Sequence, residues 1–371
     1  MAAQRICIFC GDPPEDKSKE HPLPRWLLEM TGDPNRVVCH GYRWADGQPF
    51  DFSFDSLVFP ACLLCNDRYS AFESAAKTIV ESICRKKAVT PSDYVHLLDW
   101  LDKVRIGLWL GYRYLQRNPY PPNFTIDSRL GTKDRMVAIY TVGDHQKGLN
   151  TWGPESRLFQ VKPSVFSLRV NNTIFLNASW DYMCAGRCGY SFPTKVRLAR
   201  ARPGLLVMGG FRSRRRITHP IMPNLMKSCV TLFQPIIQTN EDGSVTSMTQ
   251  ADVRYHLKHA WPGRNGVGPL IRQLSGRSVR VDAEDEPLDF DSVTLRESNR
   301  AQDIATQAYS LQNESIRLDP HEFEDGGVFE GAAGMDAFAR ENTATMEAIR
   351  ATSPVEYKKQ REALEERHKK R

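Results

Sequence analysis

The clearest periodic pattern of the chain lies in residues 91–117, where apolar side chains recur every three or four positions. Thr90-Pro91 precedes it, and proline is favoured at the first position of a helix. The pattern predicts a long helix whose broad apolar face packs on another part of the protein. Three arginines on this helix could border a phosphate track: Arg105, Arg113 and Arg117. The apolar face consists of Leu97, Leu98, Trp100, Leu101, Val104, Leu108 and Leu115.

Shorter patterns on both sides of this helix predict strands and a second helix. Residues 36–60 are aromatic-rich and alternate with period two over 50–54, and Asp46-Gly47 marks a turn between two strands. Residues 62–87 carry a helical stripe, which Asn66 and Asp67 are suited to cap. Residues 124–181 contain two strand-like runs, with a hairpin turn at Asn171-Asn172, and predict a small mixed sheet.

The distal half gives weaker signals. Residues 296–318 predict a helix, the glycines around 326–334 predict a flexible linker, and 356–371 read as a charged helix with almost no apolar face. The chain therefore divides into four expected regions of an α+β protein. These are residues 1–90, residues 91–181 with the long helix and small sheet, the basic and mixed residues 182–292, and the helical, partly flexible tail 293–371.

Composition adds little constraint on function. The 371 residues are 41% hydrophobic and 25% charged, with a formal net charge of +6, as in an ordinary globular protein that tolerates a polyanionic partner. The amino terminus lacks the apolar stretch of a secretion signal, and no run approaches the roughly 20 apolar residues that span a bilayer. We expect a cytoplasmic protein without a membrane partner.

The cysteines carry the first chemical signal. Nine are present, and four of them form two Cys-x-x-Cys pairs about fifty residues apart: Cys7 with Cys10, and Cys62 with Cys65. Such pairs are typical of a structural zinc site that joins distant segments. Four thiolates complete a tetrahedron, so Cys39 is not expected to be a ligand. Cys184 and Cys188 have the wrong spacing for a knuckle, and a second zinc there is the less favoured interpretation.

An acid, an imidazole and an amide lie close to the cysteine pairs in sequence. Glu20-His21 follows the first pair, and Asn66 directly follows Cys65. Carboxylate and amide oxygens suit hard divalent ions, and a histidine titrates near neutral pH. This combination suggests a metal-dependent nuclease. Glu73 lies seven residues after Asn66 on nearly the same helical face, so it could reach the same ion.

The order CxxC, EHxxPxW, CxxCN and a later helical Glu73 resembles the bacterial HNH-type endonucleases. The resemblance is specific over residues 5–80 and weaker as far as about residue 180. It implies a zinc-bound ββα-metal (HNH, or His-Me finger) module. In that module His21 would be the general base, and Glu20 and Asn66, with Glu73 as a further ligand, would hold Mg²⁺ or Mn²⁺. Glu73 departs from the simplest HNH pattern, which has a second histidine near the end of the unit.

The function that the resemblance implies is hydrolysis of DNA phosphodiester bonds, with RNA as another candidate substrate. By analogy of architecture, such a nuclease could be an effector in a mobile-element or antiphage system. The alternative is a catalytically inactive zinc-ribbon module that binds nucleic acid or protein. A protein partner on the C-terminal helices and a homo-oligomer are compatible with either function.

A basic run without any acidic residue occupies positions 195–216. It attracts phosphates by charge without reading bases, whereas the competing interpretation is a solvated basic loop. The nucleic-acid-binding residues expected from the sequence are Arg25, Arg212, Arg214, Arg215 and Arg216.

Overall fold

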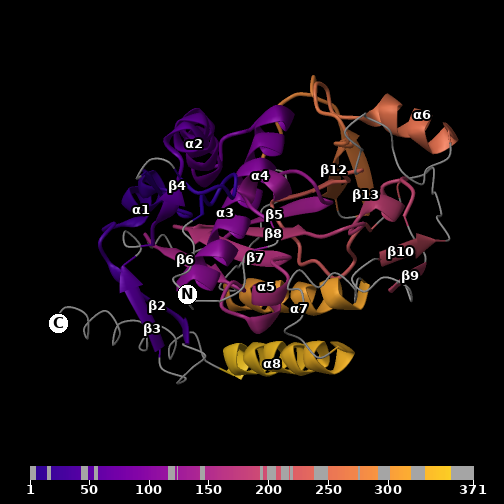
Figure 1. Ribbon diagram of the computed structural model, residues 1–371. Coiled ribbons are helices and arrows are strands. Elements are labelled where there is room, and N and C mark those ends of the chain that lie inside the picture. Colours follow the sequence, from indigo (N-terminus) through magenta and orange to yellow (C-terminus); the bar gives the residue numbers. More distant parts are fainter. Residues whose placement is uncertain are drawn as a thin grey trace.

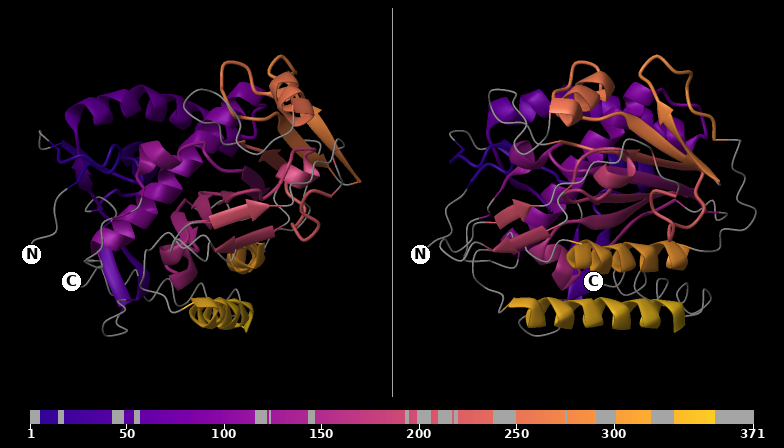
Figure 2. Two further views of the ribbon diagram at one scale, coloured as in Figure 1. Left: turned by 45° about the vertical axis from the view of Figure 1, so that its right-hand side comes forward. Right: turned by 90° about the vertical axis from the view of Figure 1, so that its right-hand side faces the viewer.

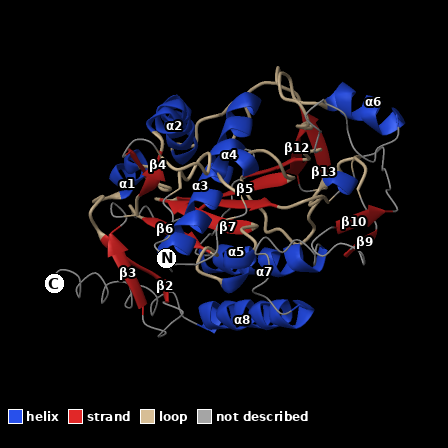
Figure 3. Ribbon diagram, viewed as in Figure 1, coloured by secondary structure: helices blue, strands red, loops and turns tan. Residues whose placement is uncertain are grey.

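The computed structural model of the protein is mixed helix and sheet, which confirms the α+β class (Figure 1). Helices cover both faces of one large central sheet, as the colouring in Figure 3 shows. The structure describes residues 6–14, 18–42, 49–53, 57–115, 122, 124–142, 147–192, 195–198, 206–209, 217, 220–237, 250–274, 276–290, 301–318 and 331–351.

The central sheet has seven strands in the order β13-β12-β11-β5-β8-β7-β6, and each adjacent pair runs antiparallel. It is larger than the small mixed sheet predicted for 124–181, because three strands of the distal half complete it. Asn171, at φ 55°, supplies the predicted hairpin turn between β7 and β8. The strands are β5 (Arg135–Thr141), β6 (Leu149–Trp152), β7 (Val165–Val170), β8 (Thr173–Ser179), β11 (Val230–Gln234), β12 (Leu270–Leu274) and β13 (Arg277–Val281).

Both faces of the central strands are buried, because alternate side chains of a strand point to opposite sides of the sheet. Val137 and Phe175 belong to the core shared with the long helix α3, whereas Met136 and Leu176 belong to the opposite core. Every residue of β8 is buried, including the polar Thr173, Asn177 and Ser179.

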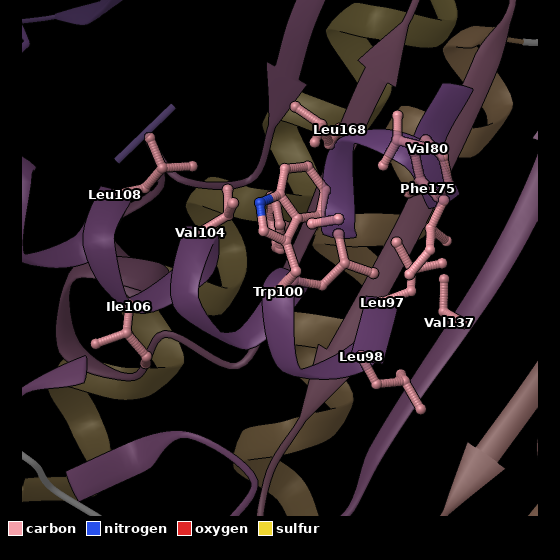
Figure 4. Packing of buried hydrophobic residues seen from close by; sticks show 14 of the residues in the cluster. Val80, Leu97, Leu98, Trp100, Val104, Ile106, Leu108, Val137, Leu168 and Phe175 are labelled. Atoms are coloured by element: carbon pink, nitrogen blue, oxygen red, sulfur yellow. The ribbon is translucent and has the colours of Figure 1, made fainter. Parts of the chain in front are cut away.

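Helix α3 (Pro91–Leu115) confirms the long predicted helix. Thr90 and Asp93 cap its start reciprocally: the Asp93 amide donates to Thr90 Oγ1 at 3.1 Å, and the Thr90 amide donates to Asp93 Oδ2 at 3.3 Å. Its side chains pack between the sheet and the N-terminal region (Figure 4). Burial extends around the helix and includes Arg105 and Arg113, so these two arginines do not border a phosphate track.

Helix α7 (Ala301–Leu318) confirms the predicted helix at 296–318 and covers the opposite face of the sheet, and α8 (Gly331–Ala351) packs beneath it (Figure 2). The linker predicted around the glycines is therefore wrong from Gly331 onward. Met335 and Phe338 of α8 are buried against α5 (Arg157–Val161), which outweighs the low helix propensity of the two glycines. The charged helix predicted at 356–371 lies outside the described residues.

The remaining elements are short. Two hairpins stand apart from the central sheet: β2 (Val37–Tyr42) pairs with β3 (Pro49–Ser53), as predicted, and β9 (Lys195–Leu198) pairs with β10 (Leu206–Gly209). The N-terminal region contains β1 (Ser18–Glu20), α1 (Arg25–Thr31), β4 (Phe59–Ala61) and α2 (Leu63–Cys84). The other helices are α4 (Ile126–Arg129), α6 (Gln250–His259) and the 3₁₀ turn η2 (Ala185–Arg187).

Candidate functional site

The four cysteines of the two pairs meet in space, with sulfur atoms all within 4.8 Å of one another. This cysteine cluster, formed by Cys7, Cys10, Cys62 and Cys65, could hold a metal ion such as zinc. Tetrahedral zinc has Zn–S bonds of about 2.3 Å, which places the sulfurs about 3.8 Å apart. The Sγ atoms of Cys10 and Cys62 are 3.9 Å apart, which fits that geometry.

Each cysteine pair is shaped by its local backbone. In the first pair, the Cys7 amide donates to Asp12 O at 2.7 Å and the Gly11 amide donates to Cys7 O at 2.9 Å. This tight turn needs φ +88° at Gly11, a conformation that glycine adopts without strain. In the second pair, Cys62 is the N-cap of α2 and Cys65 lies in its first turn. The positive end of the helix therefore faces the thiolates.

Electrostatics within the cysteine cluster oppose simultaneous ionisation of its thiols. Burial, followed by hydrogen bonding to Cys7 and Cys10, raises the pKa of Cys62 to about 11, and burial with the charges of the same neighbours raises the pKa of Cys65 to about 12. Burial alone would raise the pKa of Cys7. The hydrogen-bond donors around its sulfur, which include the Cys62 amide at 3.2 Å, outweigh burial, so the pKa of Cys7 is lowered. A bound cation supplies the charge that four thiolates require.

Packing and hydrogen bonds fix the cysteine cluster to the rest of the protein. The ring of Phe9 stacks on that of Tyr69 with centroids 4.2 Å apart. The Ile8 amide donates to Pro60 O at 3.0 Å, and Tyr69 Oη donates to Asp127 Oδ1 at 2.7 Å. The cluster therefore joins the N-terminal turn, β4, α2 and α4.

His21 directly follows β1, which pairs with β4 through Ser18↔Ala61, Lys19↔Pro60 and Glu20↔Phe59. Two glycines of α3 let this two-stranded sheet approach the helix closely. A Cβ at Gly107 would lie 3.1 Å from Pro22, and one at Gly111 would lie 2.9 Å from Phe59. The half-buried His21 is thus held at the end of a two-stranded sheet that packs directly on α3.

Asn66 contacts β1, the strand that ends directly before His21. Its Nδ2 donates to Ser18 Oγ at 2.9 Å and to Lys19 O at 3.4 Å. The expected N-cap role of Asn66 and Asp67 is wrong, because α2 begins at Leu63 and Cys62 is its cap. The amide of Asn66 instead joins the helix to the strand that leads into His21.

Glu20 and Glu73 are also brought together, but around a lysine. Lys103 of α3 is fully buried, and its ammonium donates to Glu20 Oε1 at 2.5 Å and to Glu73 Oε1. We call Glu20, Glu73 and Lys103 the acid–lysine cluster. The other oxygen of Glu73, Oε2, accepts the indole N–H groups of Trp26 at 3.0 Å and Trp100 at 3.1 Å.

The acid–lysine cluster has two carboxyl groups for one ammonium. Burial raises the pKa of Glu20, although the Lys103 ammonium acts in the opposite direction. Burial would lower the pKa of Lys103, but the carboxylates of Glu73 and Glu20 outweigh it and raise that pKa. A Mg²⁺ or Mn²⁺ ion held by both carboxylates would have to displace the ammonium, so this donor set does not fit the expected divalent site.

Sequence reasoning missed Lys103, although a signal was present. Four charged residues interrupt the apolar stretch of α3, and all four are buried: Asp99, Asp102, Lys103 and Arg105. Charged side chains that are buried are normally paired, so such a helix predicts charged partners elsewhere in the chain. The identity of those partners depends on tertiary structure.

Of the remaining predicted residues, the structure describes Arg25, Cys184 and Cys188. Arg25 is exposed at the start of α1 and pairs with Glu29 at 3.0 Å, whereas Arg212, Arg214, Arg215 and Arg216 lie outside the described residues. Cys184 and Cys188 flank η2 and are buried. Within the described part of the chain, the cysteine cluster is the one group of three or more potential ligands at metal-binding distances.

No helix among the described residues is both long and apolar enough to cross a membrane. Comparisons with protein families, curated proteins and solved structures found no match to this chain.

Proposed function

We propose that the protein is an HNH-type endonuclease that hydrolyses phosphodiester bonds of DNA, with His21 as its general base. The supporting observation is the way the cysteine cluster assembles β1, β4 and the start of α2. Asn66 follows the last cysteine and binds the backbone of β1, and His21 follows that strand. An imidazole and an amide from segments 45 positions apart are thereby held on one metal-organised scaffold.

The cysteine cluster has a structural role in this proposal, and His21 has the catalytic one. Four thiolates fill the coordination sphere of zinc, so a metal in the cysteine cluster has no open position for substrate and is structural. An imidazole with a pKa near neutrality can take a proton from an attacking water molecule, and His21 is half-buried rather than sealed in the core. The hydrogen bonds of Asn66 hold β1, the strand before His21, against the start of α2.

DNA is the proposed substrate because of charge as well as resemblance. The chain carries a net charge of +6, and Lys19 and Arg25 are exposed on the two elements that flank His21. Such charges attract any phosphate backbone, so the same argument admits RNA as substrate.

A second candidate function is a catalytically inactive module that binds nucleic acid or protein. The position of Lys103 favours it, because the two carboxylates expected to hold a catalytic ion already share an ammonium. In this candidate the cysteine cluster retains its structural role and His21 has no catalytic role.

The test is nicking of supercoiled plasmid in Mg²⁺ or Mn²⁺, with EDTA as the metal control. We expect His21→Ala to lose cleavage by about 10²–10⁴-fold, the usual effect of removing a general base. His96→Ala is the matched control, since His96 Nε2 lies 2.9 Å from Phe72 O within the core contact of α2 and α3. Equal cleavage by His21→Ala and wild type would show that another residue is the base. Absence of cleavage by wild type would favour the binding module.

A further inference from the structure

The environment of Lys103 is that of a bound cation. Its side chain has no solvent exposure, whereas those of Glu20 and Glu73 retain 11% and 14%. A lysine is rarely buried to this degree unless it is paired, and here the ammonium faces two carboxylates that are 53 positions apart in sequence. The ammonium thus lies between the two acids to which the sequence assigned a divalent ion.

The acid–lysine cluster also links four elements of the site. Glu20 comes from β1, Glu73 from α2 and Lys103 from α3, while Trp26 of α1 donates to Glu73. The rings of Trp26 and Trp100 lie 5.7 Å apart and cover the same carboxylate. Because Glu20 precedes His21 directly, the position of its carboxylate constrains the backbone that carries the imidazole.

We propose that Lys103 is an internal cation that takes the place of a divalent ion between Glu20 and Glu73, and so positions His21 through Glu20. The catalytic meaning of this assignment rests on the proposed nuclease function, whereas the cation site itself does not. Glu73 is then a structural partner of the lysine rather than a metal ligand. Any divalent ion that cleavage requires binds outside this pair of acids.

Removing the lysine charge should turn the acid pair into a divalent site. Lys103→Met keeps a long unbranched side chain but leaves two facing carboxylates, the donor set that Ca²⁺ and Mn²⁺ prefer. We expect a lowered melting temperature that rises by about 2–4 °C or more on addition of millimolar Ca²⁺. The wild type should respond less, and Lys103→Met/Glu73→Gln should lose the added response. An equal response of wild type and Lys103→Met would overturn the proposal.

A second measurement on the wild-type background covers the case in which Lys103→Met does not fold. Mn²⁺ titrations of wild type and Glu73→Gln, followed by melting and by plasmid nicking, should give the same half-maximal Mn²⁺ concentration. A tenfold rise in Glu73→Gln would show that Glu73 is a metal ligand, contrary to the proposal. If the wild type cleaves nothing, the nuclease function fails, but the melting curves still decide the role of Lys103.

Discussion

Helix α3 contributes to two buried charged clusters that are organised in opposite ways. The acid–lysine cluster has two carboxylates and one ammonium, and both carboxylates keep some solvent exposure. The second, which we call the arginine cluster, consists of Asp99, Asp102, Arg105 and Arg135. Arg264 adds a fifth member at its edge, with its Nη1 2.5 Å from Asp99 Oδ2.

The charged groups of the arginine cluster are hydrogen-bonded to one another and to Gln234. Arg135 donates to Asp99 Oδ1 at 2.5 Å, to Asp102 Oδ2 at 3.2 Å and to Gln234 Oε1 at 2.8 Å, and Arg105 donates to Asp102 Oδ1 at 2.7 Å. Burial alone would raise the pKa of Asp99, but Arg135 and Arg264 outweigh it and lower that pKa. With Arg264 included, three cations face two acids. Because cations outnumber carboxylates, this cluster does not need a metal ion to neutralise it.

The difference separates a structural cluster from a candidate functional one. The arginine cluster joins α3 to β5 and β11 within the core, where the side chains of Asp102, Arg105 and Arg135 have at most 1% exposure. The acid–lysine cluster has two carboxylates for one ammonium, and Glu20 directly precedes the half-buried His21. Burial of charge therefore does not by itself identify a site. The two clusters differ in the solvent exposure of their carboxylates and in their position relative to His21.

The largest expected effect comes from breaking the cysteine cluster. Cys62→Ser should remove the metal and yield insoluble protein, because structural zinc contributes on the order of 10 kcal/mol to folding, similar to the whole stability of a typical protein. Elemental analysis of the wild type should give one zinc per chain. Cys84→Ser, at the other end of α2, is the control and should stay soluble with full zinc. Less than half an equivalent of zinc in folded wild type would contradict this prediction.

The next effect tests the arginine cluster. Arg135→Met should lower the free energy of unfolding by about 3–5 kcal/mol, since it removes the buried guanidinium that donates to both Asp99 and Asp102. Urea denaturation measures the loss. Arg25→Met should change stability by less than about 1 kcal/mol, because the Arg25–Glu29 pair is exposed. A decrease of less than about 1 kcal/mol in Arg135→Met would mean that this cluster is dispensable.

A third effect concerns a buried histidine without a compensating charge. His256 of α6 is 1% exposed, neither ring nitrogen has a hydrogen-bond partner among the described residues, and burial lowers its pKa to about 4. The unfolded chain takes up this proton near pH 6.5, before the folded protein does, so stability falls as the pH drops from 6.5 to 4.

The expected loss over that window is about 3 kcal/mol, and it should be absent in His256→Phe. Denaturant titrations of both proteins at pH 7, 5.5 and 4 measure the difference. Parallel pH dependence of the two proteins would show that His256 does not titrate in this way.

The smallest effect on stability is expected from the basic run. Changing Arg212, Arg214, Arg215 and Arg216 together to Ala should leave the melting temperature and zinc content unchanged. If these arginines neutralise phosphates, the slope of log affinity against log salt should flatten by up to about 0.9 for each phosphate that the variant no longer neutralises. Fluorescence anisotropy with duplex DNA at several salt concentrations measures the slope. An unchanged slope would show that these four arginines do not contribute to DNA binding.

Elements with a strong local pattern were predictable from the sequence. The helix at 91–115, the β2–β3 and β7–β8 hairpins and the meeting of the four cysteines follow from periodicity, turn residues and metal-ligand spacing. The proximity of Glu20 to Glu73 was also expected. These features are encoded within short segments or in a spacing that chemistry restricts.

Features that depend on distant partners were missed. Lys103 and Glu20 are 83 positions apart, and their pairing requires α3 to lie beside β1. Strands β11, β12 and β13 were not predicted, and they are stabilised by pairing with β5 and with one another. Helix α8 begins among glycines because its apolar residues pack against α5.

The central claim is that His21, held by the cysteine cluster, supplies the imidazole that activates water. Chemical rescue tests it most directly: plasmid nicking by His21→Ala is measured with increasing free imidazole, with the wild type as the comparison. We predict that imidazole restores part of the lost rate in His21→Ala and leaves the rate of the wild type unchanged. His21→Ala that nicks as fast as wild type without imidazole would contradict the claim.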